Sequence, residues 1–239
     1  MATCESFVIV AFRGTEVRPQ GKRDYHNVIA DVLTDVNCIL VESGQGGKVH
    51  KGFKEALDEL WAPQASPAPS QGLKACLERV SRNAEQQPRP IWMTAHSLGA
   101  AVATLAADRY GNVQGLYTYG SPRVGDRDFQ ADFHVNTYRF VNNTDIVTRL
   151  PPAGFYHHVG QLKYIDSEGQ LHDNPMLWNR LVDSFRGSFA HVFNALGHVR
   201  SGFLNEIPLD QLTDHTPLYY ALHAWNNYVD ESETVTSTR

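Results

Sequence analysis

The sequence predicts an α/β fold in which a central, mainly parallel sheet carries helices on both faces. Short apolar runs typical of strands alternate along the chain with longer segments whose apolar residues recur every three or four positions. With 239 residues, 42% of them hydrophobic and 20% charged, the chain is long enough to bury a sizeable core and too apolar to be disordered. Neither an internal repeat nor a shift in composition marks a second core, so we predict one domain over residues 1–239.

The same periodicity places the individual elements. Apolar runs predict strands at residues 6–12, 36–41, 91–94, 116–119 and 138–141, and helical spacing predicts helices at 53–61, 73–85, 98–110 and 176–199. Gly111 stands where a helix commonly ends in a left-handed glycine. Residues 63–70 are too rich in proline for a helix and are predicted as a loop. Residues 161–171 are predicted as a hairpin that turns at 166–169.

Composition excludes several classes of function. A formal net charge of −5 gives no basic excess for a nucleic-acid backbone, and no apolar run approaches the roughly 20 residues of a membrane-spanning helix. The three cysteines, Cys4, Cys38 and Cys76, are odd in number and lack a C-x-x-C spacing, so neither a disulfide framework nor a zinc knuckle is expected. No H-E-x-x-H occurs either, and we predict no metal and no cofactor.

The N-terminal sequence indicates the cellular compartment in which the chain is expected. No cationic stretch precedes the first apolar run, so that run is predicted as a strand and not as a secretory signal. Cytoplasmic residence is therefore the default expectation. A secreted chain whose signal peptide had been removed would begin with the same kind of sequence, so secretion is the alternative.

The most informative segment is Ala95-His96-Ser97-Leu98-Gly99, which lies between a predicted strand and a predicted helix. In a nucleophile elbow the serine occupies a sharp turn, and the residues two before and two after it must be small, as Ala95 and Gly99 are. A serine just ahead of a helix also has backbone N–H groups nearby, with that of Leu98 the nearest, which can stabilise an anion. The alternative is that Ser97 is an ordinary helix N-cap.

Five motifs, taken together and in this order, resemble the class 3 lipase family, which comprises the fungal-type triacylglycerol lipases and their bacterial relatives. The motifs are Phe12-Arg13-Gly14-Thr15, Val49-His50-Lys51-Gly52-Phe53, Ala95-His96-Ser97-Leu98-Gly99, Tyr119-Gly120-Ser121-Pro122-Arg123-Val124-Gly125, and Val141-Asn142-Asn143-Thr144-Asp145-Ile146-Val147 followed by Leu150-Pro151-Pro152. The resemblance covers roughly residues 7–159. It implies an α/β-hydrolase fold and a serine hydrolase that cleaves carboxylic esters of lipids through an acyl-enzyme on Ser97.

A serine nucleophile needs an imidazole base and a carboxylate that orients the base, and in α/β-hydrolases these follow in the order serine, acid, histidine. Asp145 follows a predicted strand and matches the family's acid. For the base, the segment 214–220 resembles the family's late Asp-His segment followed by an aromatic residue, which points to His215. The resemblance also implies an oxyanion hole made by Thr15 and the Leu98 N–H. The remaining histidines of the C-terminal half stay as alternatives for the base: His172, His191, His198 and His223.

Other histidines match different parts of the family. His96 lies within the elbow and cannot reach its own neighbour, and His50 belongs to a strand-to-helix motif, so both are expected to pack or to form hydrogen bonds. His157 and His158 resemble a structural segment.

Two departures from the family pattern affect the expected organisation. The family has further elements ahead of the first strand, whereas this chain starts almost on it. The segment after Thr15 is longer than in compact fungal members, so we expect a lid at about residues 16–32, and a frayed polar tail at about 230–239.

A lipid or small ester is the expected substrate, with transient contact to a lipid interface. The alternatives are an esterase for small or aromatic acyl esters and a catalytically silent lipid-binding or interaction domain.

Overall fold

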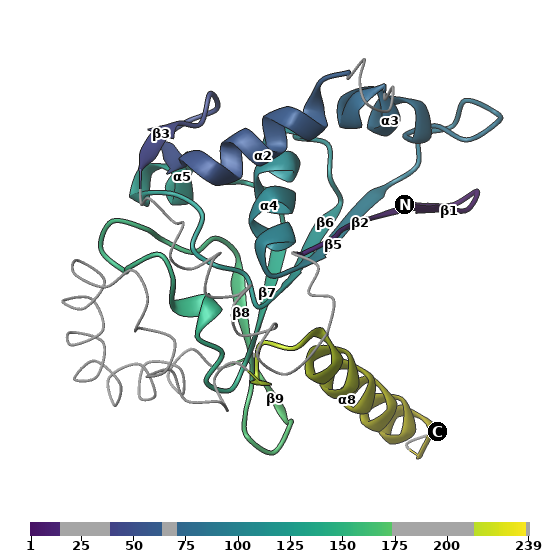
Figure 1. Cartoon of the computed structure of the whole chain (residues 1–239). Coiled ribbons are helices and arrows are strands. Elements are labelled where there is room, and N and C mark those ends of the chain that lie inside the picture. Colours follow the sequence, from purple (N-terminus) through teal and green to yellow (C-terminus); the bar gives the residue numbers. More distant parts are fainter. Residues whose placement is uncertain (15–38, 64–70, 174–212, 238–239) are drawn as a thin grey trace, which may run out of the picture. The chain divides into compact units, whose positions relative to one another are not determined.

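The computed structural model describes residues 1–14, 39–63, 71–173 and 213–237 (Figure 1). The chain divides into two compact units: unit 1 comprises Met1–Glu16, Val36–Arg139 and Arg149–Gln161, and unit 2 comprises Val17–Asp35, Phe140–Thr148 and Leu162–Arg239. The single domain stays a prediction. The expected lid at about 16–32, most of the loop at 63–70 and the expected helix at 176–199 lie outside the described residues.

Unit 1 is built on a sheet with parallel strands at its centre. Strand β2 (Val8–Phe12) pairs in parallel with β5 (Ile91–His96), which pairs in parallel with β6 (Gly115–Tyr119). The short strand β1 (Ala2–Thr3) runs antiparallel along the outer side of β2. On the far side β6 neighbours β7 (Thr137–Asn142), whose first residues belong to unit 1. The four predicted strands in this region are therefore confirmed.

The two faces of this sheet have different chemistry because side chains alternate along each strand. On one face Val8, Val10 and Met93 are fully or almost fully buried in the core of unit 1, which the alanine-rich helix α4 (Leu98–Tyr110) completes. The opposite face carries a row of aromatic rings, in which Trp92 contacts Tyr117 and Tyr117 contacts Tyr138. Helix α4 ends at the predicted position, with Gly111 in the left-handed conformation.

Three further helices and a hairpin belong to the described part of unit 1. Strands β3 (Leu40–Glu42) and β4 (Lys48–His50) form a separate antiparallel hairpin that leads into helix α2 (Lys51–Trp61). Helix α2 packs on α4, and helix α3 (Gly72–Val80) packs on α2 (Figure 1). The short helix α5 (Arg127–Asp132) is capped by Asp126, whose side chain accepts the Phe129 N–H.

Helix α3 ends five residues before the boundary predicted at residue 85. The cause is Asn83, whose side-chain oxygen accepts the N–H groups of Glu85 and Gln87 and so stabilises a turn in place of another helical turn. The turn also puts Gln86 at φ 62°. Periodicity alone extends the helix because it does not detect this local competition.

Unit 2 contains the end of β7, all but the first residue of strand β8 (Gln161–Ile165), strand β9 (Leu171–His172) and helix α8 (Pro217–Ser237). Strands β8 and β9 form the predicted hairpin, and the Asp166 carboxylate accepts the N–H groups of Glu168 and Gln170 in its turn. Asn227 ties α8 to this hairpin by accepting the Leu171 N–H. The helix continues to Ser237, and the frayed polar tail expected at about 230–239 stays a prediction. None of the helices in the described ranges is long and apolar enough to cross a membrane.

We predict that Gly99→Ala destabilises the fold and that Gly52→Ala does not, although each glycine is the second residue of its helix. A Cβ at Gly99 would lie 2.5 Å from the carbonyl oxygen of Arg13, which is backbone and cannot yield, whereas a Cβ at Gly52 would meet only the His50 ring at 3.3 Å. We expect Gly99→Ala to lower the free energy of unfolding by about 1–3 kcal/mol. Gly52→Ala should be neutral or slightly stabilising because alanine favours helix. Thermal melting measures both, and equal melting temperatures for the two variants would contradict the steric argument.

Candidate active site

Ser97 occupies the turn between β5 and α4 in an unusual backbone conformation. Its φ and ψ are 58° and −134°, a region that non-glycine residues avoid. The turn is held on one side by the Ser97 N–H, which donates to the Tyr119 carbonyl at 2.9 Å. The Ser97 side chain makes no capping hydrogen bond to the start of α4. An ordinary N-cap serine would make that bond and would have extended backbone, so the observed geometry favours the elbow over the N-cap.

The end of β2 lies directly against this turn. A Cβ placed at Gly14 would lie 3.3 Å from the Ser97 Cβ and 2.8 Å from the His96 carbonyl oxygen. A Cβ at Gly99 would lie within 2.6 Å of the Arg13 carbonyl group. Glycine at both positions therefore lets the segment that leads to residue 15 pass beside the serine. Leu98 is the first residue of α4, so its N–H is among those that have no acceptor within the helix. Thr15, the other expected oxyanion residue, lies outside the described residues.

In unit 2, Asp145 and His215 form a buried pair. The His215 Nδ1 lies 2.9 and 3.0 Å from the two carboxylate oxygens of Asp145, and the two side chains are 1% and 0% exposed. A carboxylate can only accept, so Nδ1 carries the proton and Nε2 is the basic nitrogen. Asp145 is further fixed by accepting the Val147 N–H at 2.9 Å. The two residues that the family resemblance implies as acid and base are thus in contact within this unit, whereas Ser97 and Leu98 belong to unit 1.

A third side chain, Tyr220 in the first turn of α8, completes the surroundings of the acid. Its hydroxyl donates to Asp145 Oδ2 at 2.6 Å and accepts the Asn142 N–H at 2.9 Å. Complete burial and the nearby carboxylate raise the pKa of Tyr220 well above its ordinary value, so the phenol stays protonated and acts as a donor. Asp145 therefore has hydrogen-bond donors from a backbone amide, an imidazole and a phenol.

Asp214 joins the loop of the acid to the turn of the base. Its Oδ2 accepts hydrogen bonds from the Asn143 side chain, the Thr144 N–H and the Thr144 hydroxyl at 2.8–3.0 Å. Its carbonyl oxygen accepts the Asn142 side-chain amide at 2.9 Å. Because Asp214 directly precedes His215, these four hydrogen bonds set the position of the imidazole relative to Asp145. The next helix then begins with Pro217, which suits a first helical position.

The other described histidines have surroundings that suit structural roles. His50 is buried against the rings of Phe53 and Tyr156. His172 Nε2 lies at hydrogen-bond distance, 2.7 Å, from Asp166 Oδ2 on the hairpin, and His223 stacks on Tyr219. His191 and His198 lie outside the described residues. Within the described ranges no group of three His, Cys, Asp or Glu side chains is placed to hold a metal ion.

The sequence alone does not show that Asp214 and Tyr220 form hydrogen bonds around Asp145 and His215. Both fall within the segment 214–220 that carries the resemblance to the family's Asp-His-aromatic pattern, so the signal was present. Their contacts, however, join residues 70 to 78 positions apart, and no local pattern indicates which carboxylate or amide each of them reaches.

A family model described as lipase (class 3) matches residues 9–155. The chain belongs to the class 3 lipase family. This confirms the recognition made from the five motifs, and the matched range contains both the elbow and Asp145.

Individual relatives agree with this membership. A lipase of Rhizomucor miehei is 35% identical over 175 residues, which cover 67% of this chain and 42% of the relative. The secreted mono- and diacylglycerol lipase 1 of Fusarium solani is 39% identical over 132 residues, covering 51% of this chain and 35% of the relative. The chain thus spans less than half the length of these two curated relatives.

Solved structures show the same fold. The crystal structure of a lipase from Rhizopus microsporus var. chinensis matches with a TM-score of 0.52 and 25% identity, covering 69% of this chain and 55% of that one. A fungal lipase–inhibitor complex, presented as a model for interfacial activation, matches with a TM-score of 0.51 and 26% identity, covering 70% of this chain and 60% of that one. The predicted α/β-hydrolase fold is confirmed.

We predict that Tyr220→Phe weakens unit 2 because it leaves the Asn142 N–H without its acceptor and removes a donor from Asp145. The expected loss in free energy of unfolding is about 1–3 kcal/mol at neutral pH, measured by urea denaturation. Tyr219→Phe is the matched control, since the Tyr219 side chain is more exposed, and we expect a change within about 0.5 kcal/mol.

The pH dependence gives a second readout of the same contact. Above a pH of about 10 the Tyr220 phenol ionises in the unfolded chain and not in the folded one, because its folded-state pKa is raised. The stability of the parent therefore falls as the pH rises, and the difference between parent and Tyr220→Phe should narrow. A difference that stays constant from neutral to alkaline pH would contradict the buried hydrogen bond.

Proposed function

We propose that this chain is a serine hydrolase that cleaves carboxylic esters of lipids through an acyl-enzyme on Ser97. The observation that carries the proposal is the buried Asp145–His215 pair, in which Nδ1 faces the carboxylate and Nε2 is the base. The strained backbone of Ser97 at the junction of β5 and α4 supports its role as the nucleophile. Membership of the class 3 lipase family supports the combination of the two in one triad.

The reaction follows from these roles. Nε2 of His215 takes the proton from the Ser97 hydroxyl as its oxygen attacks the ester carbonyl, and Asp145 stabilises the imidazolium that results. Collapse of the tetrahedral intermediate breaks the bond to the alcohol, which leaves with the proton returned by Nε2. A water molecule then gives a proton to Nε2 as it attacks the acyl-enzyme, and collapse of the second tetrahedral intermediate breaks the bond to Ser97 Oγ, which takes that proton from Nε2 as the carboxylic acid leaves. Asp214 and Tyr220 act as positioning residues, because they hold the acid and the base and touch neither reactant.

The negative charge on the carbonyl oxygen needs donors in the tetrahedral state. The Leu98 N–H supplies one donor, supported by its position as first residue of the helix that follows Ser97. Thr15 supplies the other, on the strength of the family resemblance. The close approach of Gly14 to Ser97 supports this, since it brings the chain past the serine one residue before Thr15.

Lipid esters are the proposed substrate class. Relatives named as a lipase, a mono- and diacylglycerol lipase and a phospholipase A1 all act on such esters, and they favour this class over the small or aromatic esters of the esterase alternative. One of these relatives is named as secreted, which favours secretion over the cytoplasmic default for this chain as well.

The triad is tested by covalent labelling together with kinetics. A fluorophosphonate should label Ser97 in the parent, and Ser97→Ala should lose both labelling and turnover. Asp145→Asn should reduce kcat by about ten thousandfold, because an amide in place of the carboxylate favours the wrong tautomer of His215. Ser81→Ala, at a partly exposed serine that caps the end of α3, is the control for labelling. His223→Ala is the control for His215→Ala.

The outcomes separate the alternatives. Labelling elsewhere, or none in a folded sample, would favour the catalytically silent lipid-binding domain. A larger loss with His223→Ala than with His215→Ala would show that the base is misassigned.

The response to a lipid surface distinguishes lipase from esterase. If the chain acts at an interface, its rate on a sparingly soluble ester should rise sharply once droplets form, because a surface rewards exposure of apolar side chains. The measurement compares rates below and above the solubility limit of the ester, with Ser97→Ala as the background. A rate that saturates while the substrate is still monomeric would favour the esterase and would argue against a lid at about 16–32.

A further inference from the structure

Helix α8 carries Tyr220 in its first turn and Asn227 two turns later. Residues seven positions apart lie on the same face of a helix, about 10 Å apart along its axis. The opposite face gives little packing within the described part of unit 2, since Leu218, Leu222 and Trp225 are exposed. The orientation of α8 in this unit therefore depends mainly on the hydrogen bonds of the face that carries Tyr220 and Asn227.

The Asn227 side chain bonds to the β8–β9 hairpin, which lies beside α8 (Figure 1). Its Oδ1 accepts the Leu171 N–H at 3.0 Å, and its Nδ2 donates to the Gly169 carbonyl at 2.8 Å. Nδ2 also donates to the His223 carbonyl, one turn earlier in α8, at 2.8 Å. Because an N–H needs an acceptor and a carbonyl needs a donor, the amide of Asn227 has a single orientation in which all of these bonds form.

The hairpin in turn holds the loop of the proposed acid. Leu171 lies opposite Ile165 in the register of β8 and β9. The Ile165 carbonyl accepts the N–H of Asn143 at 2.7 Å, and Asn143 is two residues before Asp145. The loop that carries Asp145 is therefore joined to Asn227 across the width of the hairpin.

These contacts close a ring within unit 2. The ring runs from the loop of Asp145 through β8 and β9 to Asn227, then along α8 to Tyr220, whose hydroxyl returns to Asp145 at 2.6 Å. His215 lies two residues before the start of α8, so the helix carries the imidazole with it. A helix held at Tyr220 alone is free to swing about that point. A second attachment about 10 Å along the axis prevents this rotation.

We propose that Asn227 is a positioning residue of the hydrolase, which fixes the orientation of α8 and thereby the contact between His215 and Asp145. The proposal rests on the proposed function, since it takes this pair as base and acid. The three hydrogen bonds of Asn227 go to the hairpin and to α8, so the side chain acts through the helix and not on the substrate. Its loss should appear in kcat, because a displacement of about 1 Å in a catalytic group can cost about a hundredfold in rate.

Two substitutions of Asn227 remove the link in different ways. Asn227→Ala removes the acceptor and both donors, and it should lower kcat on p-nitrophenyl butyrate by about tenfold or more, with KM changed by less than about twofold. Asn227→Asp keeps the shape of the side chain and the acceptor for Leu171, but it places an oxygen against the carbonyl oxygens of Gly169 and His223. It should lower kcat at least as much, which separates hydrogen bonding from packing.

Asn226 supplies the matched controls. It is the neighbouring residue, of the same type and in the same helix, and its side chain is exposed. Asn226→Ala and Asn226→Asp make the same changes in helix propensity and charge, and they should leave kcat and KM as in the parent. In every variant kcat is divided by the fraction of Ser97 that a fluorophosphonate labels after long incubation, so that unfolded molecules do not contribute to the difference.

A nuclear magnetic resonance signal reports on the pair without turnover. The Nδ1–H proton of His215 lies between the imidazole and a buried carboxylate, so its resonance is expected far downfield, and its loss in His215→Ala identifies it. This proton should exchange with water at least about tenfold faster in Asn227→Ala than in the parent or in Asn226→Ala. The amide of Met93, in the buried strand β5 of unit 1, should exchange equally in all three, because it reports on unfolding of the whole chain.

The outcomes distinguish the positioning role from the function on which it rests. Unchanged exchange of the Nδ1–H in both Asn227 variants would overturn the positioning role and leave the hydrolase intact. Faster exchange of the Met93 amide by the same factor would show a general loss of stability and would overturn it as well. Faster exchange of the Nδ1–H alone, with kcat unchanged, would show that the pair is not the acid and base, which overturns both proposals. If the parent neither hydrolyses esters nor is labelled at Ser97, the proposed function fails, and the Nδ1–H exchange alone decides whether Asn227 holds the pair.

Discussion

The backbone of Arg13 and Gly14 passes so close to the start of α4 that no side chain fits at Gly99. This approach joins the end of β2 to the turn at Ser97 and depends on hydrogen atoms alone at positions 14 and 99. The position of the serine relative to β2 and the start of α4 follows from it. Larger residues at positions 14 and 99 would force β2 away from α4, and the turn at Ser97 would then lose its close contact with β2.

In unit 2 the positions of the polar side chains are set by hydrogen bonds and not by close contact between backbones. Asp145, His215 and Tyr220 are almost completely buried, so each polar atom left without a partner would carry a desolvation penalty. Asp214, Asn142 and Tyr220 supply those partners, so the proposed acid and base are held by residues that have no part in the proposed reaction. An arrangement of this kind is rigid because loss of one member leaves buried polar atoms of the others unsatisfied.

The sequence predicts best those features that are local. The bounds of α4, its glycine C-cap, the hairpin at residues 161–171 and the elbow all depend on neighbouring residues, and the structure has them where they were expected. The end of α3 differs because the Asn83 side chain competes with the helix for backbone N–H groups.

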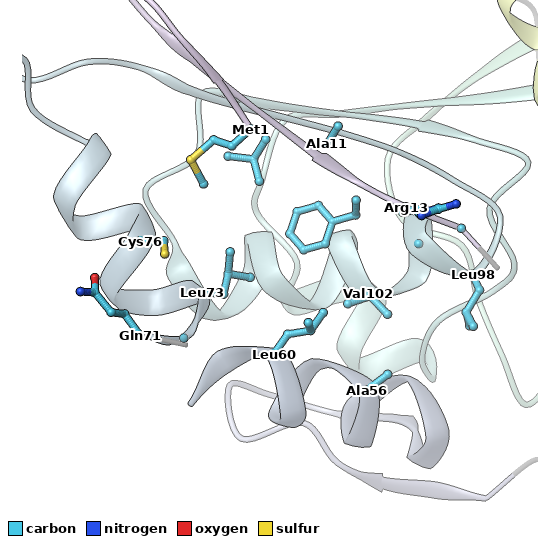
Figure 2. A pocket seen from close by; sticks show the side chains of 15 residues that line it. Met1, Ala11, Arg13, Ala56, Leu60, Gln71, Leu73, Cys76, Leu98 and Val102 are labelled. Atoms are coloured by element: carbon cyan, nitrogen blue, oxygen red, sulfur yellow. The ribbon is translucent and has the colours of Figure 1, made fainter. Parts of the chain in front are cut away.

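The remaining features are set by contacts between distant parts of the chain. The role of Tyr220 depends on a carboxylate 75 positions earlier in the sequence. A cavity of about 650 Å³ in unit 1 (Figure 2) depends on how α2, α3 and α4 meet β2, which no periodicity encodes. Asp145 and His215 could be proposed only because the order of motifs resembled a known family, and their pairing required the folded backbone.

The separation of Asp145 and His215 by 70 positions also has a consequence for biosynthesis. Closing so long a loop costs chain entropy that must be offset by other contacts first, so the pair forms late in folding. During synthesis the strands around Ser97 leave the ribosome before residue 215 exists, since chains emerge from the N-terminus. A nascent or truncated chain that stops short of this point has the elbow but lacks the base, Asp214 and Tyr220 together. If the proposed triad is the catalytic one, a growing chain therefore cannot hydrolyse an ester before residue 215 has been added and the pair has formed.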